Sequence, residues 1–139
     1  IYTGEDTLSL HDALPIYDKS CGVRVKLSWF NQNPFRSMYF AVEAMAAEMS
    51  CGMLAFGQVY KRQPAVSMLV EKLEAKFVKK ATGVIIFTCE DGEALRDTVN
   101  EALTNPAGTK LQVTSIGRNQ AGEIVAEFVF TWTFKAKNL

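Results

Sequence analysis

Apolar residues dominate positions 38 to 57, and two carboxylates, Glu43 and Glu48, interrupt the run. Alanine, methionine, leucine and glutamate all favour helices. Apolar side chains on nearly every face are typical of a helix that is buried on most sides. The segment therefore predicts a long core helix with Ser37 as its N-cap and Gly57 near its end.

The rest of the chain alternates between apolar and polar positions in short runs, which indicates half-buried strands. We expect strands over residues 22–29, 67–78, 84–89, 110–118 and 123–135. A short amphipathic helix, capped by Asp91 and ending near Leu103, is expected between the third and fourth of these strands. The last strand carries large side chains on one face. We expect the long helix to cover them, because it is the element of sufficient size.

Hairpin-linked strands form antiparallel sheets, so the order of elements predicts an α+β domain in which a curved sheet wraps around one long central helix. Roughly 120 residues leave sheet edges and part of such a helix uncovered. A homodimer, or a dimer of dimers, is therefore expected. The two glutamates argue against a membrane span at residues 38–57.

Residues 1–16 have a different origin from the rest of the chain in our interpretation. The segment Ser9–Ile16 resembles the in-frame translation of the end of a sequencing adapter, and the preceding residues fit the same oligonucleotide. We interpret residues 1–16 as a non-native segment and residues 17–139 as a single domain.

Charge and rare residues narrow the possible functions. All fifteen Lys and Arg follow residue 16 but only twelve of the fifteen acids do, which leaves a formal charge of +3 there and no argument for nucleic-acid binding. The one histidine, His11, lies in the excluded segment, so histidine-based nucleophile pairs and metal sites are not expected. Cys21, Cys51 and Cys89 lack metal spacing and suggest reduced thiols of a cytoplasmic protein.

Two segments carry a resemblance to a known family. The stretch Leu-Ser-Trp-Phe-Asn-Gln-Asn-Pro at 27–34 runs into the alanine-rich helix, and Arg-Asn-Gln-Ala-Gly-Glu-Ile-Val-Ala-Glu at 118–127 forms the closing hairpin. With the element order, these resemble the DUF4442 family of the hotdog fold, which is similar to PaaI-type thioesterases. The resemblance covers residues 21–137.

The resemblance implies a set of site residues. PaaI-type enzymes have an Asn, a His-Gly pair six residues later, and an acid nine residues after that His. By this spacing Asn33 matches the Asn and Glu48 the acid, whereas Tyr39 and Phe40 replace the His and the Gly.

The implied activity is hydrolysis of an acyl thioester of coenzyme A or a carrier protein, without a metal or an organic cofactor. Glu48 is the candidate general base or nucleophile, and burial is expected to raise its pKa. Backbone N–H groups near Phe40 and Ala41 would polarise the thioester carbonyl. Asn33 would place water or substrate, and Tyr39 could donate a hydrogen bond in place of the missing His.

Several alternatives remain open from the sequence. Glu48 could be a structural carboxylate at a dimer interface, and the protein a non-catalytic acyl- or lipid-binding module or a structural dimer without a ligand. Glu43, about 140° round the helix from Glu48, is expected to be solvated or at an interface, and Cys51 to serve packing. The pairs 61–62 and 79–80 could bind coenzyme A phosphates or be solvated loop charge.

Overall fold

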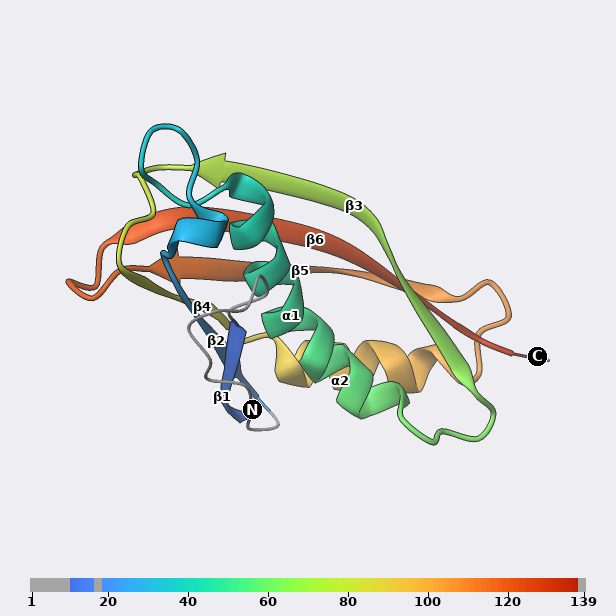
Figure 1. The fold of residues 1–139 in the computed structure, drawn as a ribbon. Helices are drawn as coiled ribbons and strands as arrows, with labels where there is room; N and C mark the ends of the chain where they lie inside the picture. The colour runs from blue at the N-terminus through green and yellow to red at the C-terminus, as the bar shows by residue number, and fades with distance from the viewer. Residues whose placement is uncertain (1–10, 17–18, 138–139) are drawn as a thin grey trace.

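The computed structural model describes residues 11–16 and 19–137. Residues 1–10, which belong to the segment interpreted as non-native, lie outside the described residues. Figure 1 shows a long curved sheet with the helix α1 (Phe40–Val59) lying along it and the shorter helix α2 (Gly92–Ala102) beside the end of α1. The expected α+β architecture, a curved antiparallel sheet around one long helix, is confirmed.

The sheet has six antiparallel strands in the order β1-β2-β4-β5-β6-β3. Their bounds are β1 His11–Ile16, β2 Cys21–Lys26, β3 Val66–Phe77, β4 Val84–Cys89, β5 Thr109–Arg118 and β6 Ile124–Ala136. A short 3-10 helix, η1 (Trp29–Asn31), follows β2. Strand β1 pairs with β2 through its backbone, and since such pairing tolerates many sequences, the interpretation of residues 1–16 stays a prediction.

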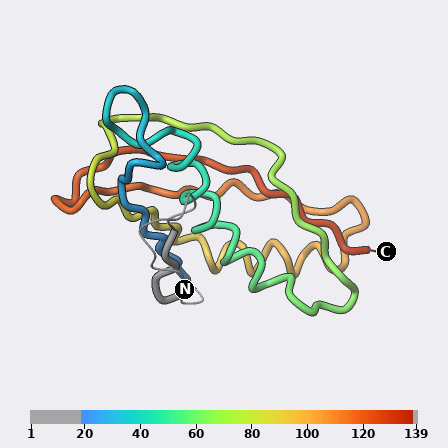
Figure 2. Tube along the Cα trace, viewed as in Figure 1, coloured from blue at the N-terminus to red at the C-terminus, as the bar shows by residue number. Residues whose placement is uncertain are grey.

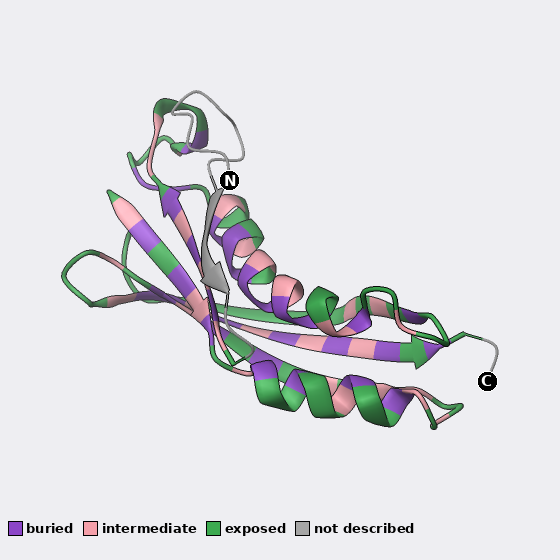
Figure 3. Cartoon of the chain, turned by 90° about the horizontal axis from the view of Figure 1, so that it is seen from below, coloured by how far each residue is buried: buried purple, intermediate pink, exposed green. Residues whose placement is uncertain are grey.

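The core forms where β6 faces α1. Strand β6 alternates strictly over most of its length, and Phe128, Phe130, Trp132 and Phe134 are all buried, as the sequence predicts. Helix α1 packs against β2, β4 and β5, and its small side chains let the sheet approach closely. Figure 3 shows this buried stripe along one side of α1 and exposed positions along the other.

The two sides of α1 differ more than its sequence indicates. Its buried residues follow helical spacing: Glu43, Ala46, Ala47, Ser50, Cys51, Leu54, Ala55 and Val59. Met45 and Phe56 on the opposite side are 50% and 56% exposed. The prediction that α1 is buried on most sides is therefore correct for only one stripe of the isolated chain.

By length and mean hydropathy, 1.2 over its most apolar window, α1 is the one described helix that could cross a bilayer. The core helix of a globular domain meets the same criterion. The packing of α1 against three strands and α2 gives its apolar side a protein partner.

Candidate functional site

A pocket of about 410 Å³ lies at the N-terminal end of α1. Three segments that are distant in sequence form it: the loop before α1, the first turn of α1, and the connection from β3 to β4, which run together in Figure 2. The N–H of Met38 donates to the carbonyl of Ala81 at 2.9 Å and ties the loop to the connection. The lining residues are Asn33, Ser37, Met38, Tyr39, Phe40, Glu43, Phe77, Val78, Lys79, Lys80 and Ala81.

Asn33 holds the loop before α1 in shape. Its Nδ2 donates to Ser37 Oγ at 3.0 Å and to the Met38 carbonyl at 3.4 Å, and its Oδ1 accepts from the N–H groups of Phe35 and Ser37 at 2.9 and 3.2 Å. An asparagine side chain has two donors and two acceptor positions, and all four are used here. The structure thus gives Asn33 a positioning role in the loop, and its direct part in catalysis stays a prediction.

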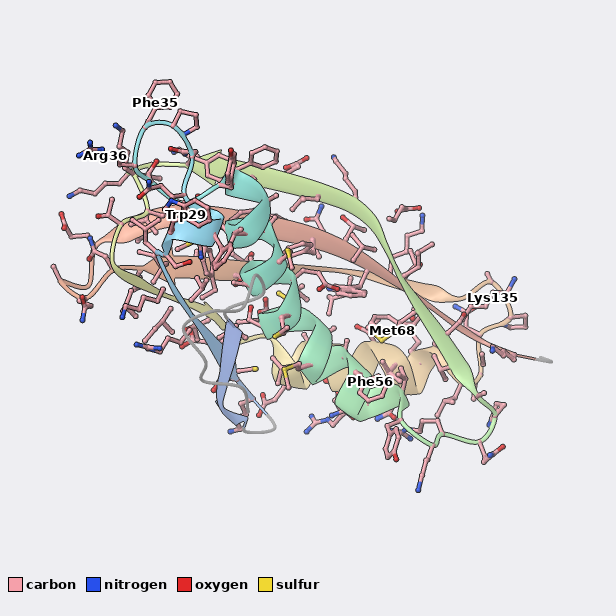
Figure 4. The ribbon with its side chains drawn as sticks, in the orientation of Figure 1. Trp29, Phe35, Arg36, Phe56, Met68 and Lys135 are labelled. Atoms are coloured by element: carbon pink, nitrogen blue, oxygen red, sulfur yellow. The ribbon has the colours of Figure 1, made fainter. Side chains whose placement is uncertain are left out.

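The loop that Asn33 holds ends in exposed aromatic and cationic side chains. Figure 4 shows Phe35 and Arg36 projecting from its tip, with Trp29 lower on the same end of the molecule. Phe35 is 74% exposed, and the Lys80 Nζ lies 5.9 Å from the centre of its ring. The pocket therefore opens beside a rim that carries positive charge.

The first turn of α1 presents the predicted backbone donors. Tyr39 is the N-cap residue, and its carbonyl accepts from the N–H groups of Val42 and Glu43 at 3.0 and 3.3 Å. Phe40 and Ala41 are the first two helical residues, whose N–H groups have no acceptor one turn earlier in the helix. Both side chains are exposed, and Phe40 packs its ring edge-on against Phe77 at 6.2 Å. The turn can therefore stabilise an anion or a polarised carbonyl.

Glu43 occupies the buried side of the pocket, so the expectation that it is solvated is wrong, whereas its place at an interface between copies stays a prediction. The residue is only 4% exposed, and its Oε1 accepts no hydrogen bond from a described residue. Burial raises the pKa of its carboxyl group to about 7. A buried carboxyl group without a partner is energetically costly, which makes it a candidate for binding or proton transfer. The stripe it shares with Ala46, Ala47 and Ser50 was the available sequence indication.

Glu48 lies outside this pocket, on the exposed side of α1. Its Oε1 lies next to Gly52: a Cβ added to Gly52 would be 3.4 Å from Glu48 Oε1 and 3.5 Å from Trp132 Cζ2. Partial desolvation raises the pKa of the Glu48 carboxyl group, although the side chain is less buried than the sequence suggested. The structure thus brings Asn33, Tyr39 and Phe40 together and leaves Glu48 further along the helix.

The two basic pairs differ in position. Lys79 and Lys80 line the pocket, although Lys79 also pairs with Glu123 at 2.5 Å. Arg62 lies beyond the other end of α1, about 30 Å away along a helix of 20 residues. Its side chain donates to the carbonyl of Gln58 and to Asn100 Oδ1 at 2.8 and 2.9 Å. Only the pair at 79–80 is placed to meet a ligand in the pocket.

The cysteines are packed in the core. Cys21, Cys51 and Cys89 are all buried and free, as expected, and a hydrogen bond with Cys89 helps to raise the pKa of the Cys51 thiol. Burial also raises the pKa of the Cys21 thiol, whereas the hydrogen bond with Cys51 lowers that of Cys89. Burial disfavours the thiolate that a nucleophile needs at Cys21 and Cys51. Among the described residues, no group of three or more His, Cys, Asp or Glu side chains is arranged to hold a metal ion.

Solved structures share this fold at low sequence identity. A protein of unknown function from Pseudomonas aeruginosa, described as a probable thioesterase, is 21% identical with a TM-score of 0.79, over 92% of this chain and 84% of that one. A protein of unknown function from Chlorobaculum tepidum is 14% identical with a TM-score of 0.80, over 94% and 85%. A thioesterase from Staphylococcus aureus is 11% identical with a TM-score of 0.69, over 90% and 93%.

These likenesses confirm the hotdog fold of thioesterase-like proteins. No curated protein matches the chain. The family model described as "Domain of unknown function (DUF4442)" matches residues 14–134, which is most of the chain and includes α1 and the whole pocket. The chain belongs to the DUF4442 family, as its element order and two sequence segments predicted.

Proposed function

We propose that this protein hydrolyses acyl thioesters at a site shared between two copies of the chain. The observation that carries the proposal is the layout of α1, with amide donors at its first turn beside a pocket and a carboxylate with a raised pKa on its exposed side. The thioesterase-like fold supports the same reaction class.

The distance along α1 requires the second copy. Glu48 follows Phe40 by eight residues, which is about 12 Å along the helix axis. Reacting groups must approach to roughly 3 Å, so the amides and the carboxylate of one helix cannot act on the same carbonyl. Two α1 helices related by a two-fold axis and running antiparallel can bring Glu48 of the partner subunit to the first turn.

The surface of the isolated chain suits such a pairing. Strand β3 is at the edge of the sheet, is twelve residues long, and exposes Leu69 and Leu73 to 67% and 45%. An unpaired edge of this length offers a row of backbone donors and acceptors to another strand. Pairing two β3 edges would extend the sheet through a homodimer and would cover the exposed side chains of α1 as well.

The reaction then needs only groups that the chain supplies. Glu48 of the partner subunit removes a proton from water as the water oxygen bonds to the thioester carbon, and the N–H groups of Phe40 and Ala41 stabilise the resulting oxyanion. When the carbon–sulfur bond breaks, the same carboxyl group returns the proton to the leaving thiolate. A raised pKa makes the Glu48 carboxylate a stronger base toward water. It also moves this pKa toward neutral pH, where one group can both accept a proton and return it.

One further comparison supports Glu48 and Asn33 as site positions. The Staphylococcus aureus protein has also been studied as two variants, in which a glutamine and a glutamate were replaced, and these two positions are 15 residues apart in its chain. Asn33 and Glu48 are separated by 15 residues here (48 − 33). The proposed substrate carriers are coenzyme A or a carrier protein, with Lys80 at the pocket rim available to a phosphate.

A non-catalytic acyl- or lipid-binding module is the second candidate. It is favoured by Tyr39, which stands where PaaI-type enzymes have a histidine, and by the Asn33 side chain, whose hydrogen bonds are all used within the loop. Such a module would use the same pocket without turnover.

The deciding experiment compares the wild type with Glu48→Gln against acyl-CoA thioesters of increasing chain length, with thiol release as the readout. We expect turnover by the wild type and a loss of two or more orders of magnitude in the variant. Glu101→Gln, an exposed change on α2, is the matched control and should leave turnover intact. Ligand-induced melting shifts without turnover would instead identify the binding module, and unchanged turnover in Glu48→Gln would discard the assigned role.

A further inference from the structure

Glu43 is a buried carboxyl group that the proposed hydrolysis does not use. It is 4% exposed, it lines the pocket, and its Oε1 accepts no hydrogen bond from a described residue. Buried polar groups in native proteins nearly always have a partner, so a carboxyl group that lines a pocket and lacks a donor points to one that a ligand brings. The pocket volume of about 410 Å³ lies within the range of small-molecule sites.

The surroundings of Glu43 restrict the chemistry of that donor. Met38, Phe40 and Phe77 give the pocket apolar walls. The charged side chains that line it are Lys79 and Lys80, both at the rim, and neither forms a hydrogen bond with Glu43. A ligand with an apolar body and a neutral donor at its buried end fits these walls, whereas a cationic end would have to pass two lysines.

We propose that this pocket selects a short acyl group that carries a hydroxyl, and that this hydroxyl donates a hydrogen bond to the Glu43 carboxyl group at the pocket wall. The inference rests on the proposed function, because it places the thioester carbonyl at the N–H groups of Phe40 and Ala41. Glu43 lies three residues beyond Phe40, about 4.5 Å along the helix axis. A hydroxyl within a few carbon–carbon bonds of the carbonyl therefore reaches the carboxyl group.

An unsubstituted acyl chain binds this site at a disadvantage. It would cover Glu43 with methylene groups and leave the carboxyl oxygen without a partner, which lowers affinity. A hydroxyl supplies the missing donor and favours the ionised form of Glu43, so its binding lowers the pKa of that carboxyl group. Selectivity arises here because one acceptor is satisfied by one ligand and not by the other.

The test uses two ligands that keep the acyl carbonyl, cannot be hydrolysed and lack coenzyme A phosphates: the S-(4-hydroxy-2-oxopentyl) and S-(2-oxopentyl) thioethers of N-acetylcysteamine. Calorimetry measures their affinities for the intact protein. We expect the hydroxylated thioether to bind the wild type about tenfold more tightly or better, since hydrogen bonds to charged groups exceed neutral ones. Carbon-13 NMR of labelled glutamate should show the Glu43 pKa falling when this ligand binds.

Two variants complete the test. Glu43→Leu should abolish the discrimination and stay folded, since an apolar residue replaces an unpaired buried carboxyl group. Glu101→Gln, an exposed change on α2 away from the residues that line the pocket, should keep the discrimination.

Equal binding of the two thioethers by the wild type, binding of neither, or discrimination that survives in Glu43→Leu overturns the inference. Selective binding without any hydrolysis of acyl-CoA thioesters supports the pocket assignment and rejects the proposed reaction. Hydrolysis of butanoyl-CoA and 3-hydroxybutanoyl-CoA at equal efficiency has the opposite meaning: it supports the reaction and rejects the selectivity.

Discussion

Replacing Glu43 with glutamine should remove a pH dependence from the stability of the protein. In the unfolded chain this carboxyl group ionises near its ordinary pKa of 4.5, whereas burial raises the value in the folded protein to about 7. Between these two values the folded state binds a proton that the unfolded state has lost. The stability that protonated Glu43 contributes is therefore fully present below pH 4.5 and is lost as the pH rises through 7.

The size of the effect follows from the pKa difference. Each pKa unit corresponds to about 1.4 kcal/mol, so the wild type should lose about 2 to 3 kcal/mol between pH 5 and pH 8 through this group. The residue is 4% exposed, which keeps solvent screening small. Because glutamine does not ionise, the free energy of unfolding of the variant lacks this dependence on pH. The amide group can shift that free energy, but by the same amount at every pH.

Urea unfolding of the wild type and Glu43→Gln at several pH values, at one protein concentration, measures the difference in free energy of unfolding. We expect this difference to move by about 2 to 3 kcal/mol in favour of the variant from pH 5 to pH 8. Glu101→Gln removes an exposed carboxyl group and should show a far smaller change. A difference that does not vary with pH would refute the argument that Glu43 is buried and unpaired.

Two further predictions concern the frame of the site. Gly117→Ala should destabilise the fold by about 1 to 3 kcal/mol, because its Cβ would lie 2.4 Å from Cε1 of the buried Phe87 ring. Gly57→Ala, which meets nothing within 4 Å in α1, should instead stabilise it by up to about 1 kcal/mol in the same unfolding assay. Leu73→Lys at the edge strand β3 should yield a folded monomer without turnover in analytical ultracentrifugation and thiol-release assays. A dimer that persists would reject the β3 pairing; Ile86→Lys, on the interior strand β4, is the control.

Much of the fold was predictable because strands and helices here obey simple periodicities. The large residues on one face of β6 predicted their own burial, and Asp91 is the N-cap residue of α2 as expected. The use of the Asp91 side chain was not predictable: its Oδ2 accepts from the N–H of Thr114 at 2.8 Å and ties α2 to β5. Such a contact depends on how distant segments pack, which local sequence does not encode.

The ends and faces of α1 show where sequence reasoning stops. The helix begins at Phe40, because Ser37 is bound to Asn33 in the preceding loop and Tyr39 supplies the capping carbonyl. It continues past Gly57 to Val59, since a glycine can remain in a helix when no left-handed turn is needed.

The choice between the two glutamates was harder still. With apolar residues on both sides of α1, hydrophobicity alone does not tell which side meets the sheet, and the 140° between Glu43 and Glu48 leaves either one free to be buried. The small residues on the same side of α1 as Glu43 determine which glutamate is buried, because the sheet approaches the helix most closely on that side. The family spacing selected Glu48, whose proposed role depends on a second copy of the chain.

The central claim is that amides and carboxylate come from different copies, and mixed dimers test it most directly. Phe40→Pro removes one amide donor at the first helical position, where proline is tolerated, and the Tyr39 ψ of 137° suits a following proline. Phe40→Ala keeps the amide and controls for the lost ring.

Phe40→Pro and Glu48→Gln should each be inactive alone, yet dimers formed from an equal mixture should regain thiol release. Half of the dimers are mixed, and each mixed dimer has one of its two sites intact, so recovery should reach about a quarter of wild-type turnover in an isologous dimer. A mixture no more active than its two components would contradict the shared site.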